Sequence, residues 1–281
     1  MTEPAGWRLR TVTFSFDHTL IMGVLNVTSD SFSNGGLFLA ADAAIRQGRA
    51  LAEAGAGIID VGGQSTRPGS EPIDVAQELD RVLPVVKALA EDGLVVSIDT
   101  DKAEVARAAI EMGAEAVNDI TSLSDPAMGE VVAGTGAGLV LMHMQGTPRT
   151  MQIDPQYDDV VAEVRQFLLE KAGQAENLGV DPACLMLDPG IGFGKTLTHN
   201  LDLLANLTEL TDTAYPVLVG TSRKSFLGTL TGVADPSDRD DVSGVAVALA
   251  IERGAKAVRV HNVAVCRRSV LVTEAIVRAE R

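Results

Sequence analysis

The stretch "LVVSIDTDKAEVARAAIEMGAEAVNDIT", residues 94–121, contains a complete strand–helix–strand pattern. It begins with a short apolar run, continues through an alanine-rich segment with helical spacing, and closes on a second apolar run. Runs that are apolar almost throughout are typical of strands buried on both faces, as in parallel sheets. The stretch therefore predicts two parallel strands joined by a helix.

The same unit repeats along the chain. Short apolar runs occupy residues 20–27, 57–62, 94–100, 116–121, 138–143, 184–190, 216–222 and 257–262, with helical patterns between them. One of these helical patterns has Asp74 as its expected N-cap, with Gln77 three residues on. Eight strands alternating with helices over about 250 residues predict a single-domain TIM (β/α)8 barrel. An open doubly wound sheet is the alternative, and it is disfavoured by the eight units and by the lack of a dinucleotide fingerprint.

We expect residues 20–281 to form this barrel and residues 1–19 to form a hairpin that closes its bottom. Two glycine-rich loops, "TSDSFSNGGLF" (28–38) and "GQSTRPGSEP" (63–72), follow the first two strands. Both are longer than the usual loop between a strand and a helix. Long loops at the rim of a rigid barrel indicate mobile lids over a substrate.

Composition excludes several classes of partner. The 281 residues include 38 acidic and 23 basic side chains, for a net charge of −15, which disfavours nucleic acid and anionic membranes. The N-terminus lacks an apolar signal region, and the apolar runs are too short to span a membrane. Cys184 and Cys266 lie far apart and suggest neither a disulfide framework nor a zinc site. We therefore expect a cytoplasmic protein that binds small molecules.

The stretch "DPGIGFGKT", residues 188–196, ends like a phosphate-binding P-loop. The P-loop pattern requires a glycine where this chain has Pro189, which has no N–H to bind a phosphate. The dinucleotide pattern fails as well, because it requires a glycine at Lys195. The stretch must serve a different purpose.

Polar residues stand at the ends of nearly all the apolar runs. They are Asn26, Asp60, Asp99, Asn118, His143, Asp188, the group Ser222, Arg223 and Lys224, and the pair Arg259 and His261. One aspartate alone could be a helix cap and one histidine alone a structural residue, but active sites of this fold lie at these strand ends. Strands three, four and six supply acceptors for a nitrogen heterocycle, and strands seven and eight supply positive charge for a phosphate. A hard cation such as Mg²⁺, held by Asn26 and phosphate oxygens, fits this ligand.

These segments resemble the dihydropteroate synthase family from about residue 20 to residue 278. The resemblance rests on "IMGVLNVTSDSFSNGG", "GAGIIDVGGQSTRPG", "SIDT", "NDI", "LMHMQGTPRTMQ", "LDPGIGFGKT", "GTSRKSFLG" and "RVHN". It implies the condensation of dihydropterin pyrophosphate with p-aminobenzoate, which gives dihydropteroate and pyrophosphate in folate synthesis. It also implies a homodimer.

The resemblance also implies roles for individual residues. Asp99, Asn118, Asp188 and Lys224 would hold the pterin, Arg259 and His261 the pyrophosphate, and Asn26 the Mg²⁺ ion. Asp99, Asp188, Lys224 and Arg259 would act in catalysis. The remaining substrate-binding residues would be Phe32, Thr66, Arg67, Pro68, Ile120, Met142, Phe193, Gly220 and Ser225.

The chain departs from the family pattern in a few places. Acids are expected at three positions where it has Asn34, Gln64 and Asn262, and a proline where it has Ser29. The three amides leave room for a non-catalytic pterin-binding paralogue. A folate-dependent methyltransferase barrel is a further alternative, but it should lack the basic residues that strands seven and eight carry here.

Overall fold

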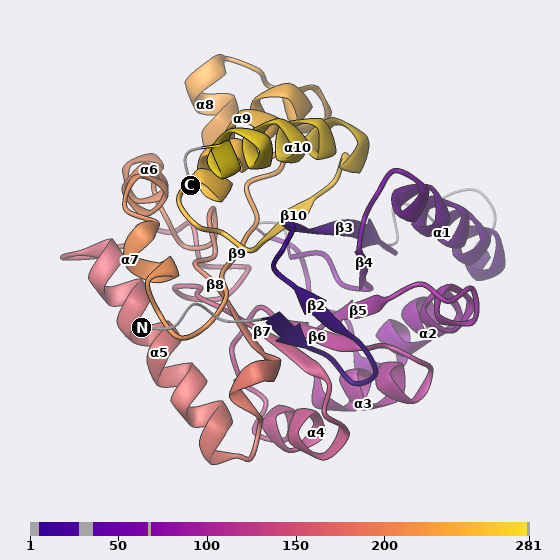
Figure 1. The fold of residues 1–281 in the computed structure, drawn as a ribbon. Helices are drawn as coiled ribbons and strands as arrows, with labels where there is room; N and C mark the ends of the chain where they lie inside the picture. The colour runs from indigo at the N-terminus through magenta and orange to yellow at the C-terminus, as the bar shows by residue number, and fades with distance from the viewer. Residues whose placement is uncertain (1–5, 28–35, 67–68, 280–281) are drawn as a thin grey trace.

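The computed structural model describes residues 6–27, 36–66 and 69–279, and shows a ring of helices around a central barrel of parallel strands (Figure 1). The strand order is β8-β7-β6-β5-β4-β3-β10-β9. The strands are β3 (Leu20–Asn26), β4 (Ile58–Gly62), β5 (Val96–Asp99), β6 (Ala116–Asp119), β7 (Gly138–Met142), β8 (Leu185–Asp188), β9 (Leu218–Val219) and β10 (Ala257–Val260).

Closure of the barrel occurs between β8 and the residues that precede β9. Leu187 forms a parallel bridge with Val217, and its N–H donates to the carbonyl of Pro216 at 2.9 Å. With this bridge every strand has a neighbour on both sides. The predicted (β/α)8 barrel and its eight strands are thus confirmed, because each apolar run satisfies its backbone groups only within a closed parallel ladder.

The helices lie outside the strands and follow them in the expected alternation. They are α1 (Gly36–Glu53), α2 (Val75–Glu91), α3 (Ala103–Glu111), α4 (Met128–Thr135), α5 (Val160–Asn177), α6 (Leu197–Ala205), α7 (Thr208–Thr211), α8 (Ser225–Thr231), α9 (Asp240–Glu252) and α10 (Val263–Ala279). Asp74 caps α2 as predicted, because its carboxylate accepts from the N–H of Gln77 at 2.8 Å. In the described part of the chain, none of these helices is long and apolar enough to cross a membrane.

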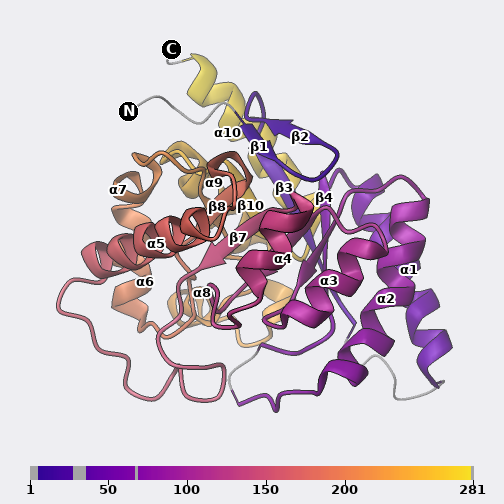
Figure 2. The same cartoon turned by 90° about the horizontal axis from the view of Figure 1, so that it is seen from below.

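The amino-terminal end of the barrel carries a two-stranded antiparallel hairpin of β1 (Gly6–Arg8) and β2 (Thr13–Ser15). Figure 2 shows this hairpin at one end of the molecule and the long loops after β4 and β7 at the other. Trp7 is fully buried in a cluster with Met22, Ile58 and Met186 from the barrel strands, and its indole N–H donates to the carbonyl of Cys184 at 2.8 Å. The hairpin therefore fills the end of the barrel opposite to the rim loops.

Replacing Trp7 with alanine should destabilise the fold by about 3–5 kcal/mol, the usual cost of removing a large buried aromatic side chain. Turnover per folded molecule should change little, since Trp7 lies at the end of the barrel away from the rim. Urea unfolding followed by circular dichroism measures the loss, and Trp7→Phe should lose less because it keeps most of the buried area. An unchanged unfolding midpoint in Trp7→Ala would show that the hairpin adds nothing to the core.

Candidate active site

The centre of the rim is an ion pair between the fully buried Asp60 on β4 and the partly buried Arg259 on β10. Asp60 Oδ2 accepts from Arg259 Nε at 2.6 Å, and the Nη2 atom of the same guanidinium donates to Asp99 Oδ2 at 2.6 Å. Asp60 also accepts from the Ser97 hydroxyl and from Asn118 Nδ2, the latter at 3.0 Å. Residues from three other strands thus converge on one fully buried carboxylate of β4.

The two carboxylates share one cation, and the pKa of Asp99 reflects this environment. Burial raises the pKa of Asp99 to about 7, although Arg259 opposes the rise, and the negative charge of Asp60 adds to it. Burial acts to lower the pKa of Arg259, but Asp60 and Asp99 outweigh it and raise that pKa above its usual range. Arg259 therefore stays charged, and neither of its two bonds uses the Nη1 atom, which can donate to an anion.

Asn118 offers a buried acceptor that lacks a partner. Its Nδ2 donates to Asp60, whereas its Oδ1 is buried with no hydrogen-bond partner among the described residues. An unsatisfied buried oxygen costs about 1–3 kcal/mol, which a ligand N–H at this position would recover. The bond to Asp60 thus fixes the Asn118 amide so that its oxygen can accept from an N–H of a nitrogen-rich ligand.

Asp188 ends β8 and begins the loop with the "DPGIGFGKT" sequence. Its carboxylate accepts from the N–H of Gly190 at 2.7 Å, and its carbonyl accepts from the N–H of His143 at 3.0 Å. Burial raises the pKa of Asp188, while the Gly190 N–H and the nearby Lys224 oppose that rise. Only glycine fits at position 190, since its φ is 64° and a Cβ there would lie 1.9 Å from the His143 carbonyl oxygen.

Lys224 and Phe193 form the next part of the rim. The Lys224 ammonium lies 3.9 Å from the centroid of the Phe193 ring, in a cation–π contact. Burial lowers the pKa of Lys224 to about 8, and the charge of Arg259 contributes to this shift. Phe193 belongs to a small apolar cluster with Ile120, Met142 and Met151, so this side of the rim offers flat apolar contacts beside its charges.

His261 is a neutral donor in this site. Burial lowers its pKa to about 3, and the cations Arg259 and Arg223 add to the shift. The Ser222 hydroxyl accepts from the His261 backbone N–H at 3.1 Å and lies 3.1 Å from Nδ1. In the tautomer in which the Ser222 hydroxyl donates to Nδ1, Nε2 carries the proton and can donate to a ligand.

Arg223 does not join the positive charge expected on this rim. Its guanidinium forms a bidentate pair with Asp240, at 2.7 and 2.9 Å, and its backbone has a left-handed φ of 61°. Asn262 Nδ2 donates to the same carboxylate at 2.7 Å, and its Oδ1 accepts from the N–H of Val265 at the start of α10. An aspartate at position 262 would place its carboxylate against that of Asp240, and the two negative charges would repel. The amide of Asn262 avoids this repulsion and donates a hydrogen bond to Asp240 instead.

Of the other predicted site residues, some are described by the structure and some are not. Asn26 is exposed at the end of β3, Thr66 is half-buried in the loop after β4, and Ser225 is exposed at the start of α8. Gly220 lies beside Arg259, because a Cβ there would be 3.8 Å from the Cβ of Arg259. The predictions for Phe32, Arg67, Pro68, Asn34 and Ser29 fall outside the described residues.

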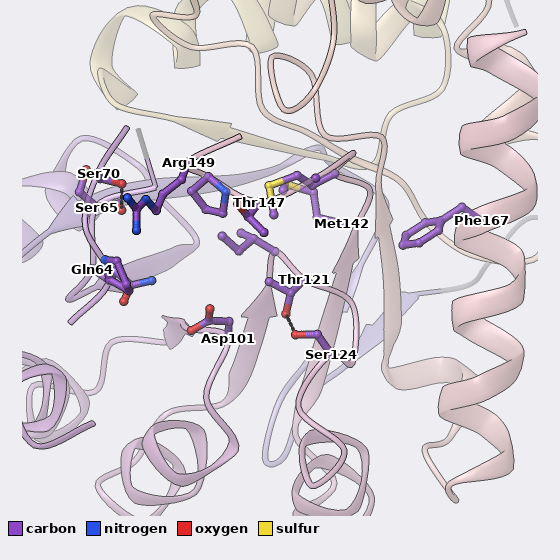
Figure 3. A pocket seen from close by; sticks show the side chains of 15 residues that line it. Gln64, Ser65, Ser70, Asp101, Thr121, Ser124, Met142, Thr147, Arg149 and Phe167 are labelled. Carbon is purple, nitrogen blue, oxygen red and sulfur yellow. Dashed lines mark hydrogen bonds between the residues drawn. The ribbon is translucent and has the colours of Figure 1, made fainter. Parts of the chain in front are cut away.

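A pocket of about 440 Å³ opens beside the small apolar cluster that contains Phe193, and two residues of that cluster, Ile120 and Met142, also line the pocket (Figure 3). Its other walls come mainly from the loops after β4 and β7, with Asp101 after β5, residues after β6 and Phe167 on α5, and Gln64, Asp101 and Arg149 stand around it in the figure. The two loops are joined where the N–H of Gly69 donates to the Pro148 carbonyl at 3.3 Å. Gln64 is fixed by donors from Ile73 and Lys102, so its amide oxygen faces the protein.

Part of this arrangement is not evident from the sequence pattern. In the sequence, Asp60 is one of several polar residues at strand ends. Its position inside the apolar run "GIIDVG" is the feature that could have indicated a buried carboxylate with several partners. Lys195 has no expected role beyond leading into a helix, yet it is buried. The loop from residue 143 to residue 159 also lines the pocket, and its glycine and proline content is the available signal.

The fold and this site together define a (β/α)8-barrel enzyme whose rim pairs buried acceptors with fixed positive charge. The sequence matches the family of pterin-binding enzymes over residues 22–261. It is 47% identical to the dihydropteroate synthase of Escherichia coli K12 over 94% of this chain and 93% of the relative, and 50% identical to that of Mycobacterium leprae over 86% and 88%. The chain therefore belongs to the dihydropteroate synthase family of pterin-binding enzymes.

Solved structures agree with this assignment. The dihydropteroate synthase of Xanthomonas albilineans with 4-aminobenzoic acid aligns with a TM-score of 0.90 at 44% identity, covering 98% of each chain. The enzyme of Burkholderia cenocepacia complexed with 7,8-dihydropteroate also aligns with a TM-score of 0.90, at 39% identity, covering 100% of this chain and 99% of that one. Identity at this level over whole chains disfavours the methyltransferase alternative.

Replacing Asp60 with alanine should destabilise the protein by about 3–5 kcal/mol, because it leaves the buried Arg259 with one carboxylate fewer. Pterin affinity should fall as well, since Asn118 loses the bond that fixes its amide. Urea unfolding and calorimetry measure the two effects. The control is Asp92→Ala, which removes the exposed partner of Arg49 and should leave both nearly unchanged. Equal stability losses in the two variants would argue against Asp60 as the hub.

Proposed function

We propose that the residues at the rim carry out the reaction of this family on 6-hydroxymethyl-7,8-dihydropterin diphosphate and p-aminobenzoate, which gives 7,8-dihydropteroate and pyrophosphate. The observation that carries this proposal is the Oδ1 atom of Asn118, which has no partner in the described part of the chain and lies on a strand between those that carry the buried carboxyl groups of Asp99 and Asp188. A pterin edge rich in N–H groups would satisfy these acceptors. The relatives from X. albilineans and B. cenocepacia, solved with 4-aminobenzoic acid and 7,8-dihydropteroate, support the choice of substrates.

In this proposal the pterin ring lies between the acceptors and the apolar cluster. Asp99, Asn118 and Asp188 accept from its N–H groups, and Lys224 donates to its ring acceptors. Ile120, Met142 and Phe193 contact the flat face of the ring. Arg259 and His261 face the pyrophosphate, through Nη1 and Nε2 respectively.

The transfer step follows from these charges. The bond between the pterin methylene carbon and the bridging oxygen breaks, and its electron pair leaves with pyrophosphate. Asp99 and Asp188 stabilise the positive charge that develops on the pterin, and preorganised electrostatics of this kind can contribute more to catalysis than any other effect. The amine of p-aminobenzoate then attacks the methylene carbon and loses a proton. No protein nucleophile is needed.

We propose Mg²⁺ as the cofactor, with Asn26 as its protein ligand. Among the described residues no group of three or more His, Cys, Asp or Glu side chains could hold a metal ion by itself. Asn26 nevertheless fits, since its exposed side chain stands at the rim and Mg²⁺ commonly takes few protein ligands together with phosphate oxygens and water. When bound, the ion would supply charge neutralisation to the leaving group.

Pyrophosphate release tests the proposal directly. Purified protein is mixed with the pterin diphosphate, Mg²⁺ and p-aminobenzoate, and pyrophosphate is measured by a coupled assay. Release that requires the arylamine supports the synthase. Tight pterin binding without release would support a non-catalytic pterin-binding paralogue, the alternative that the three amides raised.

We propose a homodimer that forms through α8, α9 and α10. Most large exposed apolar side chains of the described residues lie there, namely Leu230, Val245, Leu249, Leu271, Val272 and Ile276. Apolar patches of this kind mark protein interfaces. We also place the enzyme in the cytoplasm, because Cys184 and Cys266 are both free and a reducing compartment keeps thiols in this state.

The variant Val272→Glu should shift the protein from dimer to monomer, since it buries a charge in the proposed interface. Sedimentation velocity measures the change. The control is Ile153→Glu, at a residue that is exposed elsewhere on the molecule, and it should leave the mass unchanged. A monomeric wild type would disprove the dimer.

The pH dependence of kcat/KM should be bell-shaped. Asp99 acts as a carboxylate and its pKa is raised to about 7, so kcat/KM should rise as the pH increases through this value. Lys224 acts as an ammonium and its pKa is lowered to about 8, so kcat/KM should fall above that pH. Lys224→Arg should move the alkaline limb upward, because a guanidinium keeps its charge. An alkaline limb at the same pH in both proteins would show that Lys224 is not the group that titrates.

A further inference from the structure

Lys195, the lysine of the P-loop-like ending, is buried with only 3% of its surface exposed. Its Nζ lies 2.9 Å from His143 Nδ1, 2.9 Å from the Phe193 carbonyl oxygen and 3.4 Å from the His143 carbonyl oxygen. Each N–H of an ammonium group thus points at an acceptor. Burying a cation is costly, and this complete set of partners offsets part of that cost.

The residues that contact Lys195 also contact Asp188 and Lys224 at the rim. The N–H of His143 donates to the Asp188 carbonyl, and the His143 carbonyl is the atom that Gly190 approaches so closely. Phe193 supplies both a carbonyl to Lys195 and the ring that supports Lys224. Lys195 therefore ties the end of β7 to the loop that runs from Asp188 to its own backbone.

The state of His143 agrees with this arrangement. Burial and the neighbouring Lys195 lower the pKa of His143 to about 3, so its imidazole is neutral and accepts at Nδ1 when its proton is on Nε2. Burial lowers the pKa of Lys195 to about 7, although the negative charge of Asp188 opposes this, and Lys224 adds to the lowering. The ring of His143 packs edge-on against Phe167, with centroids 4.9 Å apart, so its orientation is fixed.

We propose that Lys195 is a positioning residue for pterin transfer. Its Nζ group holds the loop from Asp188 to Lys195 against β7, and this places the Asp188 carboxylate and the Phe193 ring toward the substrate. The proposal rests on the pterin-binding roles given above for Asp188 and Phe193. It assigns to the "GKT" ending a function different from phosphate binding.

The experiment is a double-mutant cycle between Lys195→Met and Asp188→Asn, read as the dissociation constant of a pterin that lacks the pyrophosphate. In a background with Asp188 intact, Lys195→Met should weaken binding by about tenfold or more. In the Asp188→Asn background the further loss should be less than about threefold, because the group that Lys195 positions is already impaired. Lys87→Met on α2 removes an exposed lysine and should change neither value.

Equal losses of affinity in both backgrounds would overturn the proposal and make Lys195 a general support of the fold. If Lys195→Met does not fold, Lys195→Gln enters the same cycle, since it keeps donors while removing the charge. Thermal unfolding of each variant shows whether stability and affinity change together. Pyrophosphate release by the wild type tests the proposed function separately, so a failed synthase assay leaves the coupling measurement intact.

Discussion

The pairing of the largely buried Arg259 guanidinium with Asp60 and Asp99 is the interaction on which the rest of the rim depends. It joins β10 to β4 and β5, and through Asp60 it also fixes Asn118 on β6. Removing one partner from a buried pair commonly costs about 3–5 kcal/mol, because the remaining charge is left uncompensated. The pair therefore aligns four strands, and the same cation remains able to face an anion through Nη1.

A second constraint comes from close approach of the backbone. Gly190 and Gly194 have φ values of 64° and 62°, and a Cβ at either position would fall within 2.5 Å of a carbonyl oxygen of His143 or Gln145. These contacts fold the loop after β8 onto the loop after β7. The Lys195 side chain contacts both loops, because its Nζ lies near the carbonyl oxygens of His143 and Phe193. A sequence that imitates a phosphate-binding loop thus serves to place an aspartate and a phenylalanine.

The chain has a net charge of −15, yet it presents the cations Arg259 and Lys224 together at the rim. Arg259 remains charged, Lys224 is fixed over Phe193, and His261 donates without charge. Arg223 is neutralised by Asp240, and Asn262 adds a donor to that carboxylate. Arg223 is therefore balanced within the protein, whereas Arg259, Lys224 and His261 are the basic groups that the proposed reaction uses.

The sequence by itself determined the barrel, the family and most of the polar rim. Eight apolar runs with helices between them have few other ways to satisfy their backbone groups, and strand ends such as Asp99, Asn118 and Asp188 must meet at one edge of a parallel barrel. Only the tertiary structure decided the partners of these groups. Asp60 and Arg259 are 199 positions apart, and Lys195 and His143 are 52 apart. No local pattern encodes such pairs, because burial and distance in the folded chain determine which charges meet.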